Sequence, residues 1–188
     1  MLTYLIVIIA NLLIGGMIGL TGIAGFLLPM LYSGFMGMPA VQALALSFFA
    51  FLISGILGSW NYYKAKNRQI PLPVCILFGL ITAAVCALSG AGGPILVMPL
   101  LVVMGVPVKT AVGVALFDSI FIAIPSCIGY TMQCDILSIG GLLAVSMISH
   151  GIGVWFGSHN TSFLKPELLK KSVAVFSILI AVVKLITG

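Results

Sequence analysis

The chain has 188 residues, of which 62% are hydrophobic and 6% are charged, and its formal net charge is +5. No water-soluble domain of this size needs so apolar a sequence, and apolar runs of about 18 residues or more are typical of membrane spans. The composition therefore predicts an all-α polytopic membrane protein. Its few basic residues lie between the apolar runs, where they set orientation and contact anionic lipid, so we expect no nucleic-acid partner.

The apolar runs predict about six long membrane helices and two short ones in a single transmembrane domain, residues 1–188. The first run lacks a basic segment and a clear cleavage site, so we expect a retained span and not a signal peptide. The long helices are expected at Leu2–Leu20, Pro39–Tyr62, Pro71–Ala87, Pro107–Tyr130, Ile136–Phe156 and Ser172–Ile186, and the short ones at Phe26–Phe35 and Ile95–Met104. At ~1.5 Å per residue, a short helix covers about half of a ~30 Å hydrocarbon core.

A glycine-rich break precedes each short helix. Glycine loses the most backbone entropy in a helix interior, so closely spaced glycines indicate an interruption. The glycines concerned are Gly22 and Gly25 in the first break and Gly90, Gly92 and Gly93 in the second. Pro94, which follows the second break, suits the first turn of a new helix because its φ is already fixed.

The two breaks belong to an internal repeat. Leu20–Tyr62 aligns without gaps on Leu88–Tyr130, and 12 of the 43 aligned positions are identical. We divide the domain into repeat A, residues 1–70, and repeat B, residues 71–188. A broken segment in each of two repeats is the best sequence indication of a binding site in a membrane transporter.

The relative orientation of the repeats depends on whether each short helix carries the chain across the membrane. If it does, the repeats are inverted and seven basic residues are cytoplasmic: Lys64, Lys66, Arg68, Lys109, Lys165, Lys170 and Lys171. If it does not, the repeats are parallel and the loop 165–171 is external. The excess of Lys and Arg in cytoplasmic loops favours the inverted arrangement.

The sequence around the breaks resembles the sulfite exporter TauE/SafE family of membrane permeases. The resemblance covers about Gly15 to Gly157 and is carried by Gly22-Ile-Ala-Gly25 with Pro29, and by Ser89-Gly-Ala-Gly-Gly-Pro94 with Pro99, each followed by Gly-x-Pro. It implies transport of small sulfur-containing anions, such as sulfite or organosulfonates, across the cytoplasmic membrane. It also implies that repeat A lacks its last two helices.

The shortened repeat leaves several roles open. The chain is either a minimal permease, a permease that works as a homo-oligomer, or a non-transporting membrane subunit or truncated remnant that packs against a partner. No nucleotide-binding loop, metal-ligand spacing or nucleophile–base pair occurs, so we expect neither an enzyme nor a cofactor.

The breaks are the first candidate for the substrate site. Helix N-termini present unpaired amides and a partial positive charge, which suit an oxyanion, and the hydroxyls of Thr21 and Ser89 occupy equivalent positions beside them. The predicted contributors are Thr21, Gly22, Gly25, Ser89, Gly90, Gly92, Gly93 and Pro94. The alternative is that the small residues only let helices pack closely.

Five further positions are candidates for the transport pathway. Asp118, the acid inside a predicted span, either exchanges a proton during transport or is neutral and hydrogen-bonded to a neighbouring helix. His150 is either a packing residue or a proton relay. Asn61, Tyr62 and Tyr130 either line the mouth of the pathway or belong to an interfacial belt.

Overall fold

The computed structural model describes residues 2–22, 24–64 and 93–160, with single positions at 77, 171 and 175. In these residues every regular element is helical, and four helices are long and apolar enough to cross a membrane. The four are α1 (Leu2–Thr21), α3 (Ala40–Lys64), α6 (Val108–Thr131) and α7 (Ile136–His159). They match four of the six predicted long helices; the two expected at Pro71–Ala87 and Ser172–Ile186 fall outside the described residues.

Two shorter elements follow the glycine breaks. The first is continuous from Ala24 to Phe35 and changes type along its length: η1 (Ala24–Phe26) is a 3-10 turn, α2 (Leu27–Pro29) is α-helical and η2 (Met30–Phe35) is a π-helix. Pro29 has no N–H to donate to the preceding turn, which disfavours a regular α-helix here. The second element, α5 (Gly93–Val103), stays α-helical and contains Pro99.

Equivalent positions of the internal alignment have the same backbone conformation. Gly37 and Gly105 end the two short elements with φ of 65° and 87°, a left-handed conformation that favours glycine. Pro39 and Pro107 then each accept a hydrogen bond, from the amides of Ala43 at 3.0 Å and Ala111 at 2.9 Å. The Gly-x-Pro pattern thus stops one helix and starts the next in both halves.

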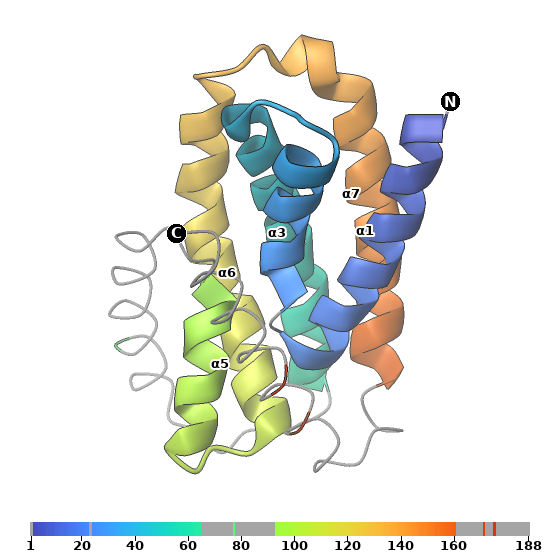
Figure 1. Ribbon diagram of the computed structural model, residues 1–188. Helices are drawn as coiled ribbons and strands as arrows, with labels where there is room; N and C mark the ends of the chain where they lie inside the picture. The colour runs from blue at the N-terminus through green and yellow to red at the C-terminus, as the bar shows by residue number, and fades with distance from the viewer. Residues whose placement is uncertain are drawn as a thin grey trace.

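The equivalent helices of the two repeats run in opposite directions through the bundle (Figure 1). The helix α1 runs from the N-terminus to the lower end of the view, the segment 24–35 returns upward, and α3 runs down again. In the second half α5 runs down, α6 runs up and α7 runs down. Elements at equivalent positions of the repeat, 24–35 with α5 and α3 with α6, therefore run in opposite directions.

Packing is closest along two helix pairs, α1 with α7 and α3 with α6, while α3 also packs on α7 and α5 on α6. Glycines set the α1–α7 distance: a Cβ on Gly153 would collide with the carbonyl oxygen of Leu12, and one on Gly157 with that of Gly16. Close approach through small residues is the usual way for membrane helices to associate, because lipid gives no hydrophobic drive between them.

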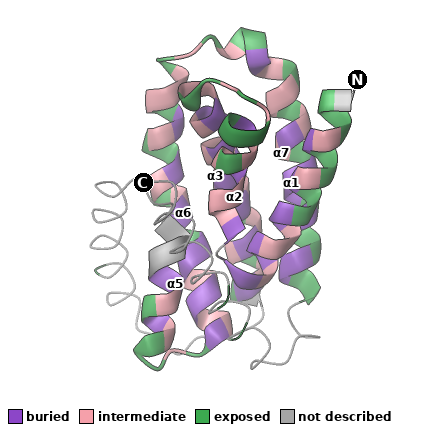
Figure 2. Ribbon diagram, viewed as in Figure 1, coloured by how far each residue is buried: buried purple, intermediate pink, exposed green. Residues whose placement is uncertain are grey.

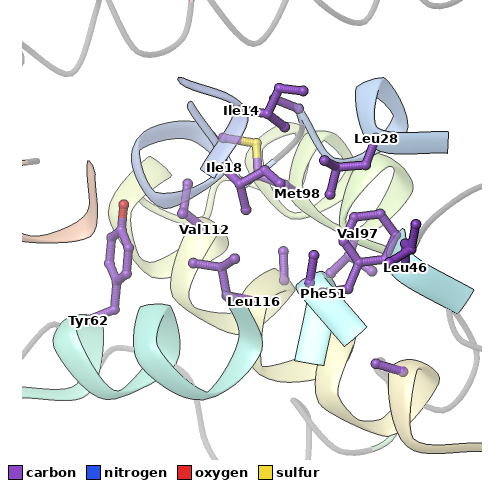
Figure 3. Packing of buried hydrophobic residues seen from close by; sticks show 14 of the residues in the cluster. Ile14, Ile18, Leu28, Leu46, Phe51, Tyr62, Val97, Met98, Val112 and Leu116 are labelled. Atoms are coloured by element: carbon purple, nitrogen blue, oxygen red, sulfur yellow. The ribbon is translucent and has the colours of Figure 1, made fainter. Parts of the chain in front are cut away.

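The core lies between the short elements and α3 and α6. Val97 and Met98 of α5 are fully buried and pack with Leu28, Leu46 and Leu116 in one cluster (Figure 3). Exposed residues lie mainly on the outer sides of the helices (Figure 2) and many are large and apolar, among them Leu13, Phe121 and Ile148. An apolar exterior around a packed interior is what lipid surroundings require.

Candidate functional site

The first break begins where α1 ends. Gly22 has a φ of 74°, and its amide donates to the carbonyl of Ile18 at 2.7 Å, which closes the last turn of α1. The hydroxyl of Thr21 donates to the carbonyl of Met17 at 2.7 Å. For Thr21 to donate to an anion, its hydroxyl hydrogen would have to leave that carbonyl.

Both glycines of the first break are packed against neighbouring helices. A Cβ on Gly22 would lie 3.4 Å from Cγ1 of Val112 in α6, and a Cβ on Gly25 would lie 2.8 Å from Cε1 of Phe51 in α3. The turn η1, which contains Gly25, also contacts α5. The break therefore lies where α3, α5 and α6 meet, and glycine is required at position 25 for close approach.

Of the predicted residues at the second break, Ser89, Gly90 and Gly92 lie outside the described residues. Gly93 and Pro94 form the first turn of α5, and their side-chain surroundings also lie outside the described part. The described geometry nevertheless shows that α5 and η1 are in contact while their helices run in opposite directions (Figure 1).

The aromatic candidates lie at two ends of the bundle. The hydroxyl of Tyr62 donates to the carbonyls of Gly19 at 3.0 Å and Leu20 at 3.4 Å, so it caps the end of α1 beside the break. Asn61, the preceding residue, donates from Nδ2 to the hydroxyl of Ser158 at 2.8 Å. Tyr130 lies near the end of α6, at the opposite end of the bundle (Figure 1), and stacks on Phe48.

Asp118 lies near the middle of α6 and is 4% exposed. Its Oδ2 has no hydrogen-bond partner among the described residues. The next residue, Ser119, donates to the carbonyl of Leu116 in its own helix at 2.6 Å. A buried carboxylate oxygen without a partner is costly inside a membrane, so this position carries a free-energy cost that both expected roles of Asp118 share.

His150 lies near the middle of α7 and is fully buried. Its Nε2 is 2.7 Å from the hydroxyl oxygen of Ser54 in α3, and its Nδ1 has no hydrogen-bond partner among the described residues. A Cβ on Gly15 of α1 would lie 3.2 Å from this Nδ1. The absence of a side chain at position 15 therefore gives the imidazole its space.

A polar contact that the sequence analysis missed lies one helical turn away. Nδ2 of Asn11 in α1 donates to the hydroxyl of Tyr32 at 2.8 Å, and Tyr32 can in turn donate to Oδ1 of Asn11, 3.1 Å away. Both side chains are fully buried. The available signal was the amide of Asn11 itself, the one Asn or Gln in the first span, which lipid would not accommodate without a partner.

Among the described residues, no group of three or more His, Cys, Asp or Glu side chains is placed to hold a metal ion. The model of the family described as sulfite exporter TauE/SafE matches residues 74–187. The chain belongs to the sulfite exporter TauE/SafE family. Comparisons with curated proteins and with solved structures gave no significant match.

Family membership makes this TauE/SafE chain a transmembrane permease and not an enzyme. The matched segment contains α5, α6 and α7, and with them Asp118 and His150. It begins after α3, so the first break and the Asn11–Tyr32 contact lie in the unmatched part of the chain. The resemblance expected from Gly15 onward is thus matched in its second half and extends further toward the C-terminus.

Proposed function

We propose that the chain is a secondary transporter of small sulfur-containing anions, such as sulfite or organosulfonates, in the cell membrane. The observation that carries the proposal is the family match together with the contact between η1 and α5. The turn η1, which begins the first short helix, contacts α5, and the two short helices run in opposite directions (Figure 1). We infer from this that their first turns face a shared region. Two helix N-termini aimed at one place favour an anion there.

The contributors to this proposed site are the groups predicted from the sequence. They are Thr21, Gly22 and Gly25 in the first break and Ser89, Gly90, Gly92, Gly93 and Pro94 in the second. Pro94 has no N–H, so it contributes only the fixed φ of a first helical turn. The close packing of Gly22 and Gly25 also supports the alternative, in which these glycines only permit helix contact. Anion binding and close helix packing are compatible at Gly25, because a glycine permits the packing and leaves its backbone amide accessible to an anion.

An inverted repeat fits this arrangement. The opposite directions of α3 and α6 support inversion, and the segment 24–35 returns the chain between α1 and α3 (Figure 1). The end of α3, which carries Lys64, and the start of α6, which carries Lys109, lie at the same end of the bundle. We assign this end to the cytoplasm, because Lys and Arg concentrate on that side.

Flux of radiolabelled sulfite into proteoliposomes tests the proposal. Thr21→Val keeps the shape of the side chain and removes its hydroxyl, while Ser33→Ala removes an exposed hydroxyl that donates to the carbonyl of Pro29 in the same way. A lost hydrogen bond to a charged group costs about 1.5–3 kcal/mol. Thr21→Val should therefore raise the sulfite concentration that gives half-maximal flux about tenfold or more. Ser33→Ala should behave as the wild type.

The second candidate is a non-transporting subunit, and the same experiment identifies it. Folded protein that gives no flux of sulfite or of any organosulfonate would contradict the transport proposal. Flux that appears only in a cross-linked dimer would assign the activity to a homo-oligomer, in which a second copy completes the shortened repeat.

A further inference from the structure

Five polar side chains from four elements meet in the interior of the bundle. Each is at most 1% exposed: Asn11 in α1, Tyr32 in η2, Ser54 in α3, and Ser146 and His150 in α7. We call these five residues the polar cluster. Tyr32 is hydrogen-bonded to Asn11 and lies near the side chain of Ser146, while His150 is bonded to Ser54. Ser146 and His150 are one helical turn apart, so the two bonded groups lie on one face of α7.

The polar cluster is not needed to hold the helices together. Glycine contacts already bring α1 and α7 into backbone contact. Hydrogen bonds between membrane helices contribute little to stability, whereas polar groups inside a membrane are costly and mark function by default. Nδ1 of His150 has no hydrogen-bond partner in the part of the chain that the structure describes, which adds to this cost.

The hydrogen bonds of Ser54 define which nitrogen of His150 is free to gain a proton. The hydroxyl of Ser54 is 3.0 Å from the carbonyl of Ala50, to which it can donate its single hydrogen. Nε2 of His150 then carries the hydrogen of the 2.7 Å contact, and Nδ1 carries a lone pair. In this tautomer Nδ1 is the nitrogen that can take up a proton.

We propose that His150 is the proton-exchange group of this permease, with Ser54 as the residue that positions its imidazole; the inference rests on the proposed anion transport. Nδ1 takes a proton from water when the contact with Gly15 opens, and the imidazolium returns it to water on the other side of the membrane. No bond other than N–H forms or breaks. Imidazole suits this role, because its charge changes within the physiological pH range.

The polar cluster also connects His150 to the proposed anion site. Tyr32 lies in the short element 24–35, whose other end carries Gly25 at the first break. A charge on His150 therefore acts one turn of α7 away from Ser146, which lies near Tyr32. Proton uptake can in this way change the position of the helix whose N-terminus receives the anion.

Few other ionisable groups face His150. In the described residues of the elements packed against α7, α1 has Tyr4 near its start and η2 has Tyr32 in the polar cluster. The helix α3 has Tyr62, Tyr63 and Lys64 in its last turn, far from Ser54 in the sequence. Asp118 belongs to α6, which packs against α3 and not closely against α7.

The test compares proton coupling with anion exchange in proteoliposomes, using radiolabelled methanesulfonate because this anion does not titrate. Each protein is measured for counterflow without a pH gradient and for accumulation driven by a pH gradient, and the readout is the ratio of the two. In His150→Gln the gradient-driven part should fall to the level of protein-free vesicles. The matched control Ser149→Ala removes a neighbouring hydroxyl bonded within α7 and should keep the wild-type ratio.

Ser54→Ala and Asp118→Asn complete the comparison. Ser54→Ala leaves the imidazole titratable but removes the partner of Nε2, so the pH at half-maximal coupling should move while coupling persists. Coupling that is lost in Asp118→Asn and kept in His150→Gln would overturn the inference. Wild-type counterflow that no pH gradient affects would also overturn it, and would leave the anion transport proposal standing. Absence of counterflow in the wild type would contradict the transport proposal itself.

A spectroscopic measurement on the wild type covers the case in which His150→Gln does not fold. The chain has two histidines, His150 and His159, so nitrogen NMR of histidine-labelled protein in nanodiscs can follow both imidazoles. The inference expects His150 to titrate between about pH 5 and 8 when methanesulfonate is present. Nitrogen shifts of His150 that remain those of neutral imidazole over this range would overturn it.

Discussion

Gly157 of α7 lies directly against Gly16 of α1, so that a Cβ at position 157 would collide with the carbonyl oxygen of Gly16. Gly153 stands in the same relation to Leu12, one turn earlier in both helices. On the other side, a Cβ on Gly19 would lie 2.5 Å from the carbonyl oxygen of Val154. We call this glycine contact between α1 and α7 the seam. The two backbones touch there directly, which is possible only because these positions are glycines without side chains.

Substitution in this seam should destabilise the protein. Gly157→Ala forces α1 and α7 apart, and overpacking of this kind costs roughly 1–3 kcal/mol, which should lower the melting temperature in detergent. Gly140→Ala is the matched control, because no atom lies within 4 Å of its Cβ position in the same helix. Alanine there should be neutral or stabilising by about 1 kcal/mol. Equal melting temperatures for the two variants would contradict the claim that close packing at Gly157 stabilises the protein.

The equivalent turns at Gly37 and Gly105 should respond equally to alanine. Both glycines have positive φ and both have open space around the Cβ position, so the cost is backbone strain alone. We expect Gly37→Ala and Gly105→Ala each to cost about 1–2 kcal/mol in denaturant unfolding, and asparagine to cost less at both positions. A large effect at one position with none at the other would contradict equivalent roles for the two turns.

Removal of the Tyr32 hydroxyl should affect transport more than stability. Tyr32→Phe keeps the ring and deletes the bond to Asn11, which should cost about 0.5–1.5 kcal/mol of unfolding free energy. If this contact positions the short helix, methanesulfonate flux should fall clearly in the same variant. Tyr4→Phe removes the hydroxyl of an exposed tyrosine in α1 and serves as the control. Unimpaired flux in Tyr32→Phe would show that the contact is only structural.

Side-specific labelling of cysteines tests the orientation of the repeats. In a background without the other cysteines, Lys64→Cys and Lys109→Cys should react with an impermeant maleimide from the cytoplasmic side. Cys134, between α6 and α7 and partly exposed, should react from the outside. Parallel repeats predict a different result, because Lys64→Cys and Lys109→Cys would then react from opposite sides.

Asp118→Asn distinguishes the two roles expected for this acid. Asparagine is close in shape to the neutral carboxylic acid, so a permanently protonated Asp118 predicts near-normal folding and transport with an unchanged pH profile. A flattened pH profile in Asp118→Asn would instead assign proton exchange to this residue. The measurement is methanesulfonate counterflow across a series of pH values, with Ser119→Ala as the neighbouring control.

Local chemistry made much of the described fold predictable. Long apolar runs located α1, α3, α6 and α7 to within a few residues, and Gly-x-Pro located both turns after the short helices. The π-helical form of Met30–Phe35 was not predictable, because it depends on where Pro29 and the neighbouring helices leave the backbone hydrogen bonds. A sequence pattern therefore predicts where a helix begins and ends better than it predicts whether the helix is α or π.

Contacts between distant helices were harder to predict. Gly15 with Gly19 and Gly153 with Gly157 are visible as spaced pairs, but the spacing does not say which helix each pair will contact. The same holds for His150, where the sequence indicated a buried role and the partner, Ser54, came from the packing of α3 on α7. The anion role of the breaks stays a prediction.

The seam between α1 and α7 joins helices from the two ends of the described chain, and this affects how the protein is made. During synthesis α1 leaves the ribosome first, and its partner follows only after α3, α5 and α6 have been translated. Until then the glycines of α1 lack the contacts with α7 that they have in the finished bundle. Assembly therefore depends on the insertion machinery keeping the first helix available until the late helix arrives.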